Sequence, residues 1–213
     1  SDLEKRLIKE HYTVLSAKEH MQRLDNLLWK RHLRSARRML PLVDEDRKTL
    51  ALARIGLMEF AGNVDTLISK VTPHTKNNSG LIFDRVRWRR VKGLDANARK
   101  LLLATPNPSQ RPKVWWKERH IQVRRALAHG EITDAYRLAH YHGMKKGGKD
   151  YAQAEWLAGW IALRFLRDGQ NALYHFTQLH TAVHRPISRA RAAYWAGRAA
   201  QNLDEKKLAF TWY

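Results

Sequence analysis

The sequence predicts an all-α protein in which short antiparallel helix hairpins stack into a solenoid. Apolar residues recur every three or four positions almost throughout the 213 residues, which is the period of amphipathic helices. No segment alternates convincingly between apolar and polar residues, and glycine and proline are scarce, at 11 and 6. The length suffices for one large or two small domains with a sizeable core.

Glycines mark the ends of two expected helices in the first two thirds of the chain. Gly93 is expected to end a helix over 85–92, and Asp95 to cap the next one. Gly130 is expected to end a helix over 114–129, and Thr133 to cap its successor.

Three further signals divide the rest of the chain. The run Thr-Pro-Asn-Pro at 105–108 predicts a break, and Asp168-Gly169 predicts a boundary between helices over 156–167 and 171–179. Pro186 suits the first turn of a helix that reaches about Gln201. These boundaries indicate roughly six helix hairpins.

The helix expected around residues 154–166 is apolar on two sides. One side comprises Ala154, Leu157, Ala158, Ile161, Ala162 and Phe165, and the other Trp156, Trp160 and Leu163. A helix of this kind is held between two neighbours, as in stacked helix pairs. We therefore expect Trp156, Trp160 and Trp195 to belong to the core rather than to a ligand site.

Two hairpins resemble each other. Leu-Ala-Gly at 157–159 matches Trp-Ala-Gly at 195–197, 38 residues later, and 172–176 recurs at 208–213 one residue out of step. This spacing is near the tetratricopeptide period of about 34 residues and predicts a divergent, tetratricopeptide-like solenoid. Gly159 and Gly197 are expected to let adjacent helices pack closely.

Composition excludes several chemistries. Without cysteine the chain has no disulfide, no Cys-ligated zinc, no iron–sulfur cluster and no thiol nucleophile. The 11 histidines form no His-Glu-x-x-His motif, and His140 and His142 would point in different directions on one helix. We expect surface or helix-end histidines, no metal, no cofactor and no catalytic residue. The glycine-rich segment 145–149 lacks the spacing of a phosphate-binding loop and is expected to join two hairpins.

Positive charge is the unusual feature of the composition. Lys and Arg number 40 against 20 Asp and Glu, which gives a net charge of +20 and favours polyanionic partners. Half of this excess lies in residues 84–130, where Arg and Lys are grouped around Trp88 and around Trp115 and Trp116. Such residues can stack on bases or sugars while pairing with anions, although Trp on such helices is more often core, with Arg lying over it. We expect the arginines to face solvent or an anion, because unpaired Arg is costly to bury.

Two long motifs carry a family resemblance. The segments 154–166 (AEWLAGWIALRFL) and 186–200 (PISRARAAYWAGRAA) resemble the α-helical superhelical region of soluble lytic murein transglycosylases. Shorter matches are RLD at 23–25 with LW at 28–29, DRVRWRR at 84–90 and AYRLA at 135–139. The resemblance covers essentially the whole chain.

The resemblance implies a right-handed superhelical ring of helices that precedes a lysozyme-like catalytic domain in a periplasmic, peptidoglycan-binding enzyme. In that family a Glu-Ser glutamate protonates the glycosidic oxygen, and the muramic C6 hydroxyl attacks to leave a 1,6-anhydro end. No Glu-Ser pair occurs here, and Gly-Leu-Met-Glu at 56–59, inside a helical run over 50–60, echoes a family motif by coincidence. We therefore expect residues 1–213 to be an inactive helical fragment whose catalytic domain lies beyond 213.

Three functions follow as alternatives. The first is a region that positions the enzyme on peptidoglycan, with stem-peptide carboxylates bound by Arg87, Arg90, Lys117 and Arg124 and with other periplasmic cell-wall proteins as further partners. The second is a basic helical repeat that binds nucleic acid. The third is a tetratricopeptide-like adaptor that binds proteins. No apolar run is long enough to suggest a membrane span.

Overall fold

The computed structural model describes residues 16–106 and 110–213, and the chain divides into two compact units, up to Lys92 and from Gly93. The expectation of an all-α protein is confirmed, since the described residues form thirteen α-helices, one 3-10 turn, one π-helical turn and no strand. In this part of the chain no helix is both long and apolar enough to cross a membrane.

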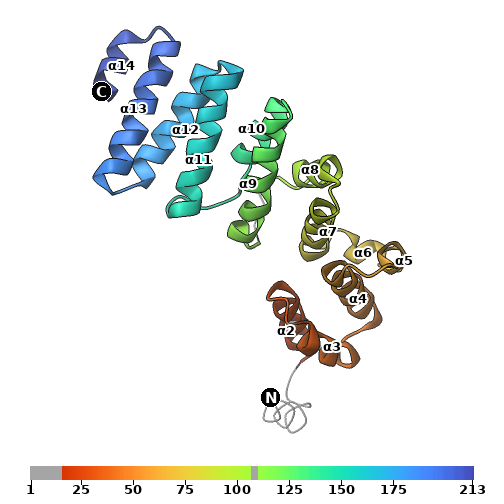
Figure 1. Ribbon diagram of the computed structural model, residues 1–213. Helices are drawn as coiled ribbons and strands as arrows, with labels where there is room; N and C mark the ends of the chain where they lie inside the picture. The colour runs from red at the N-terminus through yellow and green to blue at the C-terminus, as the bar shows by residue number, and fades with distance from the viewer. Residues whose placement is uncertain (1–15, 107–109) are drawn as a thin grey trace. The chain divides into compact units, whose positions relative to one another are not determined.

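The first unit is built around one central helix. Its elements are α2 (Ala17–Trp29), α3 (Leu33–Met39), the 3-10 turn Leu40–Leu42, α4 (Glu45–Glu59), α5 (Val64–Ser69), α6 (Pro73–Lys76) and α7 (Ser79–Val91). Helix α4 packs against α2, α5, α6 and α7 (Figure 1). Its N-terminus is capped by Asp44, whose carboxylate accepts the backbone N–H of Arg47.

An ion-pair cluster joins α2, α4 and α7 within this unit. Arg54 of α4 is 1% exposed, and its guanidinium donates to Asp84 at 2.7 Å and to Asp25 at 2.8 Å. The same guanidinium lies 5.2 Å from the ring centre of Trp29. A side chain at Gly80 would overlap the Arg54 guanidinium, so this position must stay glycine for the cluster to form. The motifs at 23–29 and 84–90 thus meet at one buried arginine.

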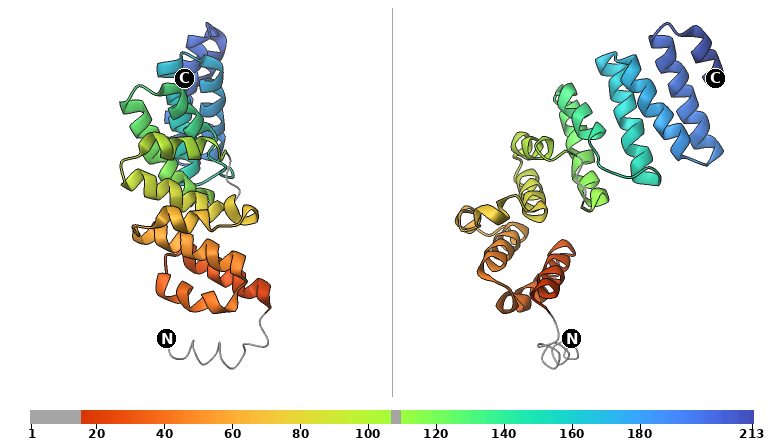
Figure 2. Two further views of the ribbon diagram at one scale, coloured as in Figure 1. Left: turned by 90° about the vertical axis from the view of Figure 1, so that its right-hand side faces the viewer. Right: turned by 180° about the vertical axis from the view of Figure 1, so that it is seen from behind.

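In the second unit each helix packs mainly on its neighbours in sequence. The elements are α8 (Asp95–Leu103), α9 (Pro112–Ala128), α10 (Ile132–His140), α11 (Lys149–Ile161), the π-helical turn Ala162–Leu166, α12 (Gly169–Ala182), α13 (Pro186–Asn202) and α14 (Lys206–Trp212). Successive pairs from α9 to α14 are in contact, and α11 to α14 follow one another side by side in the right-hand view of Figure 2.

Most of the expected helix ends are confirmed. Gly93 and Gly130 follow the ends of α7 and α9 with φ of +74°, a left-handed conformation that favours glycine. Asp168 caps α12 by accepting the Asn171 N–H at 2.9 Å, and Pro186 is the first residue of α13. The break expected at 105–108 follows the end of α8, but 107 and 108 lie outside the described residues.

Two expected caps are wrong. Helix α8 begins at Asp95 itself and α10 begins at Ile132, so Asp95 and Thr133 lie inside the first turns. The Asp95 carboxylate instead accepts from Gln122 at 2.8 Å and from Arg125 at 2.5 Å, both on α9. Side-chain donors on a neighbouring helix, one of them the charged Arg125, outcompete the local N–H groups for this carboxylate.

The close packing expected at the repeated glycines is confirmed. A Cβ at Gly159 of α11 would lie 2.9 Å from the ring of Phe176 in α12. A Cβ at Gly197 of α13 would lie 2.6 Å from the ring of Tyr213, which follows α14. The hairpins α11–α12 and α13–α14 therefore each contain the same kind of glycine–aromatic contact.

Candidate functional site

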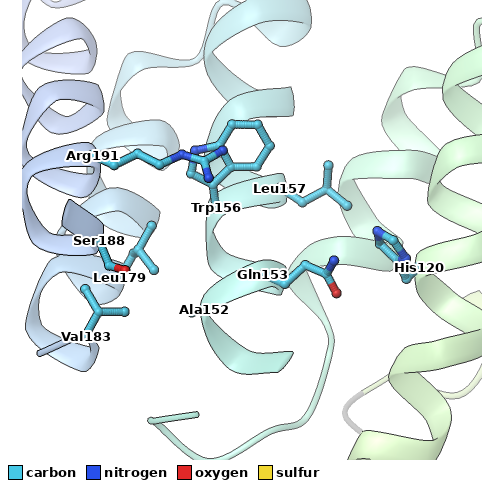
Figure 3. Close-up of a pocket in the computed structure, with 9 residues that line it drawn as sticks. All are labelled: His120, Ala152, Gln153, Trp156, Leu157, Leu179, Val183, Ser188 and Arg191. Atoms are coloured by element: carbon cyan, nitrogen blue, oxygen red, sulfur yellow. The ribbon is translucent and has the colours of Figure 1, made fainter. Parts of the chain in front are cut away.

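A cleft of about 370 Å³ opens among α9, α11, α12 and α13 of the second unit (Figure 3). Residues from all four helices line it, together with Val183 just after α12. They are His120, Ala152, Gln153, Trp156, Leu157, Leu179, Val183, Ser188 and Arg191. Ligand sites commonly combine such an apolar lining with a few polar groups.

An aromatic ring and a cation form the centre of the cleft. The Arg191 guanidinium carbon lies 4.2 Å from the centre of the Trp156 ring, within the range of a cation–π contact. Trp160 stacks on Trp156 with 5.9 Å between ring centres and 12° between planes. The indole N–H of Trp156 is buried and has no hydrogen-bond partner among the described residues.

Three neutral polar groups surround this pair. The Gln153 side-chain carbonyl accepts from the Trp116 indole N–H at 3.0 Å, which leaves the Gln153 amide NH₂ as a donor. Burial, together with the charge of Arg124, lowers the pKa of His120, so its imidazole is neutral at pH 7. Ser188 adds a hydroxyl group. No acidic side chain is among the described residues that line the cleft.

Two of the four residues predicted to bind substrate flank this cleft. Lys117 and Arg124 lie three residues before and four residues after His120 on α9, and therefore on the same side of the helix. Both are exposed. They place positive charge next to the cleft that His120 lines.

The other two predicted residues lie elsewhere. Arg87 and Arg90 are on α7 in the first unit, and both are only partly exposed. The charge of Arg87 acts on Asp84 and Arg31 of the same unit. The four residues are therefore divided equally between the two units.

Arg119 contradicts the expectation that the arginines of this stretch face solvent or an anion. It is fully buried, and its guanidinium donates to the backbone carbonyls of Leu102 (2.9 Å), Thr105 and Leu138 (3.5 Å). Burial lowers the pKa of Arg119 to about 10, so the side chain keeps its charge at neutral pH. Carbonyl groups at helix ends supply the compensation that we expected only from solvent or an anion.

The tryptophans divide between core and cleft. Trp115 and Trp116 are 0% and 2% exposed, which confirms the core interpretation for α9. Trp156, Trp160 and Trp195 are half-buried and pack against the apolar cluster that α12 and α13 share. The packing of these three rings against the core is confirmed, but Trp156 also lines the cleft and Trp195 lines a second hollow, so their exclusion from a ligand site stays a prediction.

A buried polar network, which the sequence analysis missed, lies around Glu155 of α11. His175 Nδ1 on α12 is 2.6 Å from one carboxylate oxygen, and His142 Nε2 is 3.2 Å from the other. The Met144 backbone N–H donates to His142 Nδ1, so His142 carries its proton on Nε2 and donates it to Glu155. His175 Nε2 in turn lies 3.1 Å from His140 Nδ1.

This network corrects the surface interpretation of the histidines. His142 and His175 are 6% and 2% exposed. Burial by itself would raise the pKa of Glu155, but the hydrogen bonds from His142 and His175 outweigh it and lower the pKa to about 2. Burial, with the nearby His175, lowers the pKa of His140. In the described part of the chain, no group of three or more His, Asp and Glu side chains is arranged to hold a metal.

The network ties the loop after α10 to α11 and α12. One signal in the sequence pointed to it: Glu155 lies in the middle of a helix that is apolar on two sides, where a charge requires buried partners. The identity of those partners depends on the packing of three segments.

Comparison with known proteins adds no relative. No family model, no curated protein and no solved structure matches this chain.

Proposed function

We propose that this chain is the helical, non-catalytic region of a periplasmic peptidoglycan lytic transglycosylase, and that it holds murein for the catalytic domain. The observation that carries the proposal is the cleft in which Arg191 covers Trp156 and neutral donors surround them. The two motifs that resemble the family, at 154–166 and 186–200, supply α11 and α13, two of the helices that line it.

The chemistry of the cleft matches that of a peptidoglycan strand. Sugar rings have an apolar face that packs on an indole, and the exposed Arg191 side chain that covers Trp156 must move aside for such a contact. The hydroxyl and acetamido groups of the sugars need donors such as the Gln153 amide and the Ser188 hydroxyl. Stem peptides carry carboxylates, which Arg191, Lys117 and Arg124 attract. Among the described residues, the lining offers no carboxylate that would repel them.

The proposal includes a tetratricopeptide-like, right-handed superhelical stacking of the hairpins. Sequential contacts from α9 to α14 support it, as does the glycine–aromatic contact that the hairpins α11–α12 and α13–α14 share. A stack of this kind presents several hairpins to one long polymer.

Binding to purified sacculi tests the proposal. The cleft variant K117Q/R124Q/R191Q removes three charges at the site, and the matched variant K70Q/K206Q/K207Q removes three exposed charges elsewhere. We expect the cleft variant to lose most of its binding at low salt and the matched variant to bind like the wild type. Failure of the wild type to bind, or equal losses in the two variants, would overturn the proposal.

Nucleic-acid binding is the second candidate, and the net charge of +20 favours it. Competition at one salt concentration separates the two: sacculi, heparin and a DNA duplex are offered in equal amounts of negative charge. We expect sacculi to be preferred, because only they combine sugar rings for Trp156 with stem-peptide carboxylates for the arginines. A preference for the duplex, lost equally in both triple variants, would favour the second candidate.

A further inference from the structure

Residues on one side of α13 line the cleft and, further along the helix, a second hollow. Positions spaced by three, four, three and four residues lie on the same side of this helix. They are Ser188, Arg191, Trp195, Arg198 and Asn202. The first two line the cleft, and the last three line a second hollow of about 440 Å³.

A matching series runs along α11 and into the π-helical turn. It comprises Gln153, Trp156 and Trp160 on α11, Leu163 in the turn, and Arg167, which follows the turn with φ of +54°. Gln153 and Trp156 line the cleft, whereas Leu163 and Arg167 line the second hollow. The two helices therefore contribute to both hollows in the same order.

Three arginines dominate the second hollow. Arg164, Arg167 and Arg198 are all exposed, and none has an ion-pair or hydrogen-bond partner among the described residues. The remaining lining residues are Leu163, Trp195, Gln201 and Asn202, so the described lining contains no acid. Three guanidinium groups around one hollow repel each other, and an anion between them relieves that repulsion.

Contacts between tryptophans join the two hollows. The Trp156 ring, in the cleft, lies 6.3 Å from the ring of Trp195 in the second hollow, with an angle of 82° between the planes. From Ser188 to Asn202 the side of α13 extends about 21 Å, at 1.5 Å per residue. A ligand that occupies both hollows must be elongated over a comparable length, as a peptidoglycan strand is.

We propose that the two hollows are subsites of one binding surface for a single peptidoglycan strand. A sugar ring lies against Trp156 in the cleft, and a stem-peptide carboxylate further along the same strand is bound by Arg164, Arg167 and Arg198. Guanidinium groups suit this role because they bind carboxylate through two parallel hydrogen bonds, which lysine cannot do. This inference rests on the proposed function and names the part of the strand that each subsite binds.

The test compares ligands that differ only in peptide content and length. The ligands are glycan strands of several disaccharides with stem peptides, the same strands after amidase removes the peptides, and a single disaccharide-peptide. The proteins are the wild type, R164Q/R167Q/R198Q, the lysine variant R164K/R167K/R198K and the matched control K70Q/K206Q/K207Q. Thermal melting verifies that each variant is folded, as expected for substitutions of exposed side chains.

We expect the wild type to bind the peptide-bearing strand more tightly than either other ligand. The glutamine variant should bind this strand about tenfold more weakly, since three exposed ion pairs are lost together, and bind the peptide-free strand like the wild type. The lysine variant should lie between the two, because it keeps the charge and loses the two-point geometry. The matched control should bind like the wild type.

The outcomes separate this inference from the proposed function. If the wild type binds no strand, the proposed function itself is wrong. If the wild type binds and the glutamine variant binds the peptide-bearing strand equally well, the second subsite is wrong while the proposed function stands. Amidase leaves a lactyl carboxylate on each muramic acid, so an equal loss on the treated strands would overturn the assignment of the arginines to the stem peptide. Equal affinity for the single disaccharide-peptide would overturn the assignment of the two subsites to separate units of one strand.

Discussion

Replacing Glu155 by glutamine tests the buried network of the second unit. The carboxylate accepts hydrogen bonds from His175 Nδ1 at 2.6 Å and from His142 Nε2 at 3.2 Å. Glutamine has nearly the same shape but offers a single oxygen, so one imidazole N–H is left facing an NH₂ group. A buried donor without an acceptor costs about 1–3 kcal/mol.

The pKa of Glu155 gives a second measure of the same loss. Its value of about 2 in the folded protein, against 4.5 for an unperturbed glutamate, means that folding favours the ionised form. At about 1.36 kcal/mol per pKa unit, this amounts to about 3 kcal/mol at pH 7. Because the folded pKa is depressed, this stability is present above pH 4.5 and is lost as the pH falls through about 2.

Denaturant unfolding followed by circular dichroism measures both effects. We expect E155Q to be about 3 kcal/mol less stable than the wild type at pH 7, and the difference to shrink as the pH falls from about 5 towards 2. E205Q is the matched control, because Glu205 is exposed and its side chain makes no capping bond to α14. Equal stability of E155Q and wild type at pH 7, or a difference that does not change with pH, would refute the reasoning.

Three further predictions concern packing and activity. Gly80→Ala should destabilise the first unit by about 1–3 kcal/mol in thermal or urea unfolding, because the added methyl group displaces Arg54 from Asp25 and Asp84. Gly62→Ala is the control: its methyl group would have no atom within contact distance, so this variant should be as stable as the wild type or slightly more stable. Alanine at Trp156, Trp160 or Trp195 should each cost about 3 kcal/mol, near the lower end for large-to-small core changes since the rings are half-buried. At Trp156 sacculus binding should fall as well, whereas unchanged melting with lost binding at Trp160 or Trp195 would assign that ring to the ligand instead of the core. The chain alone should release no 1,6-anhydro-muropeptides from sacculi, because it has no Glu-Ser pair; turnover that one Glu→Gln substitution abolishes would show that the catalytic glutamate had been overlooked.

Local signals in the sequence determined the helical class and most of the helix ends. Gly93 and Gly130 follow helices because a left-handed φ of +74° strains any residue with a Cβ, and Pro186 begins α13 because its fixed φ suits a first turn. The close contacts of Gly159 and Gly197 were also predictable, since the same small residue recurs in both hairpins. These features depend on neighbours within a few residues or on one repeat.

Tertiary packing determined the hydrogen-bond partners of the polar side chains. Asp95 accepts from Gln122 and Arg125 rather than capping its own helix, and buried Arg119 donates to carbonyl groups 14 to 19 residues away.

The candidate site likewise depends on long-range packing. Glu155 meets two histidines from separate segments, and the cleft needs α9, α11, α12 and α13 together. A buried charge requires a compensating partner. The position of that partner depends on how the helices stack, and not on the residues that neighbour the charge in the sequence.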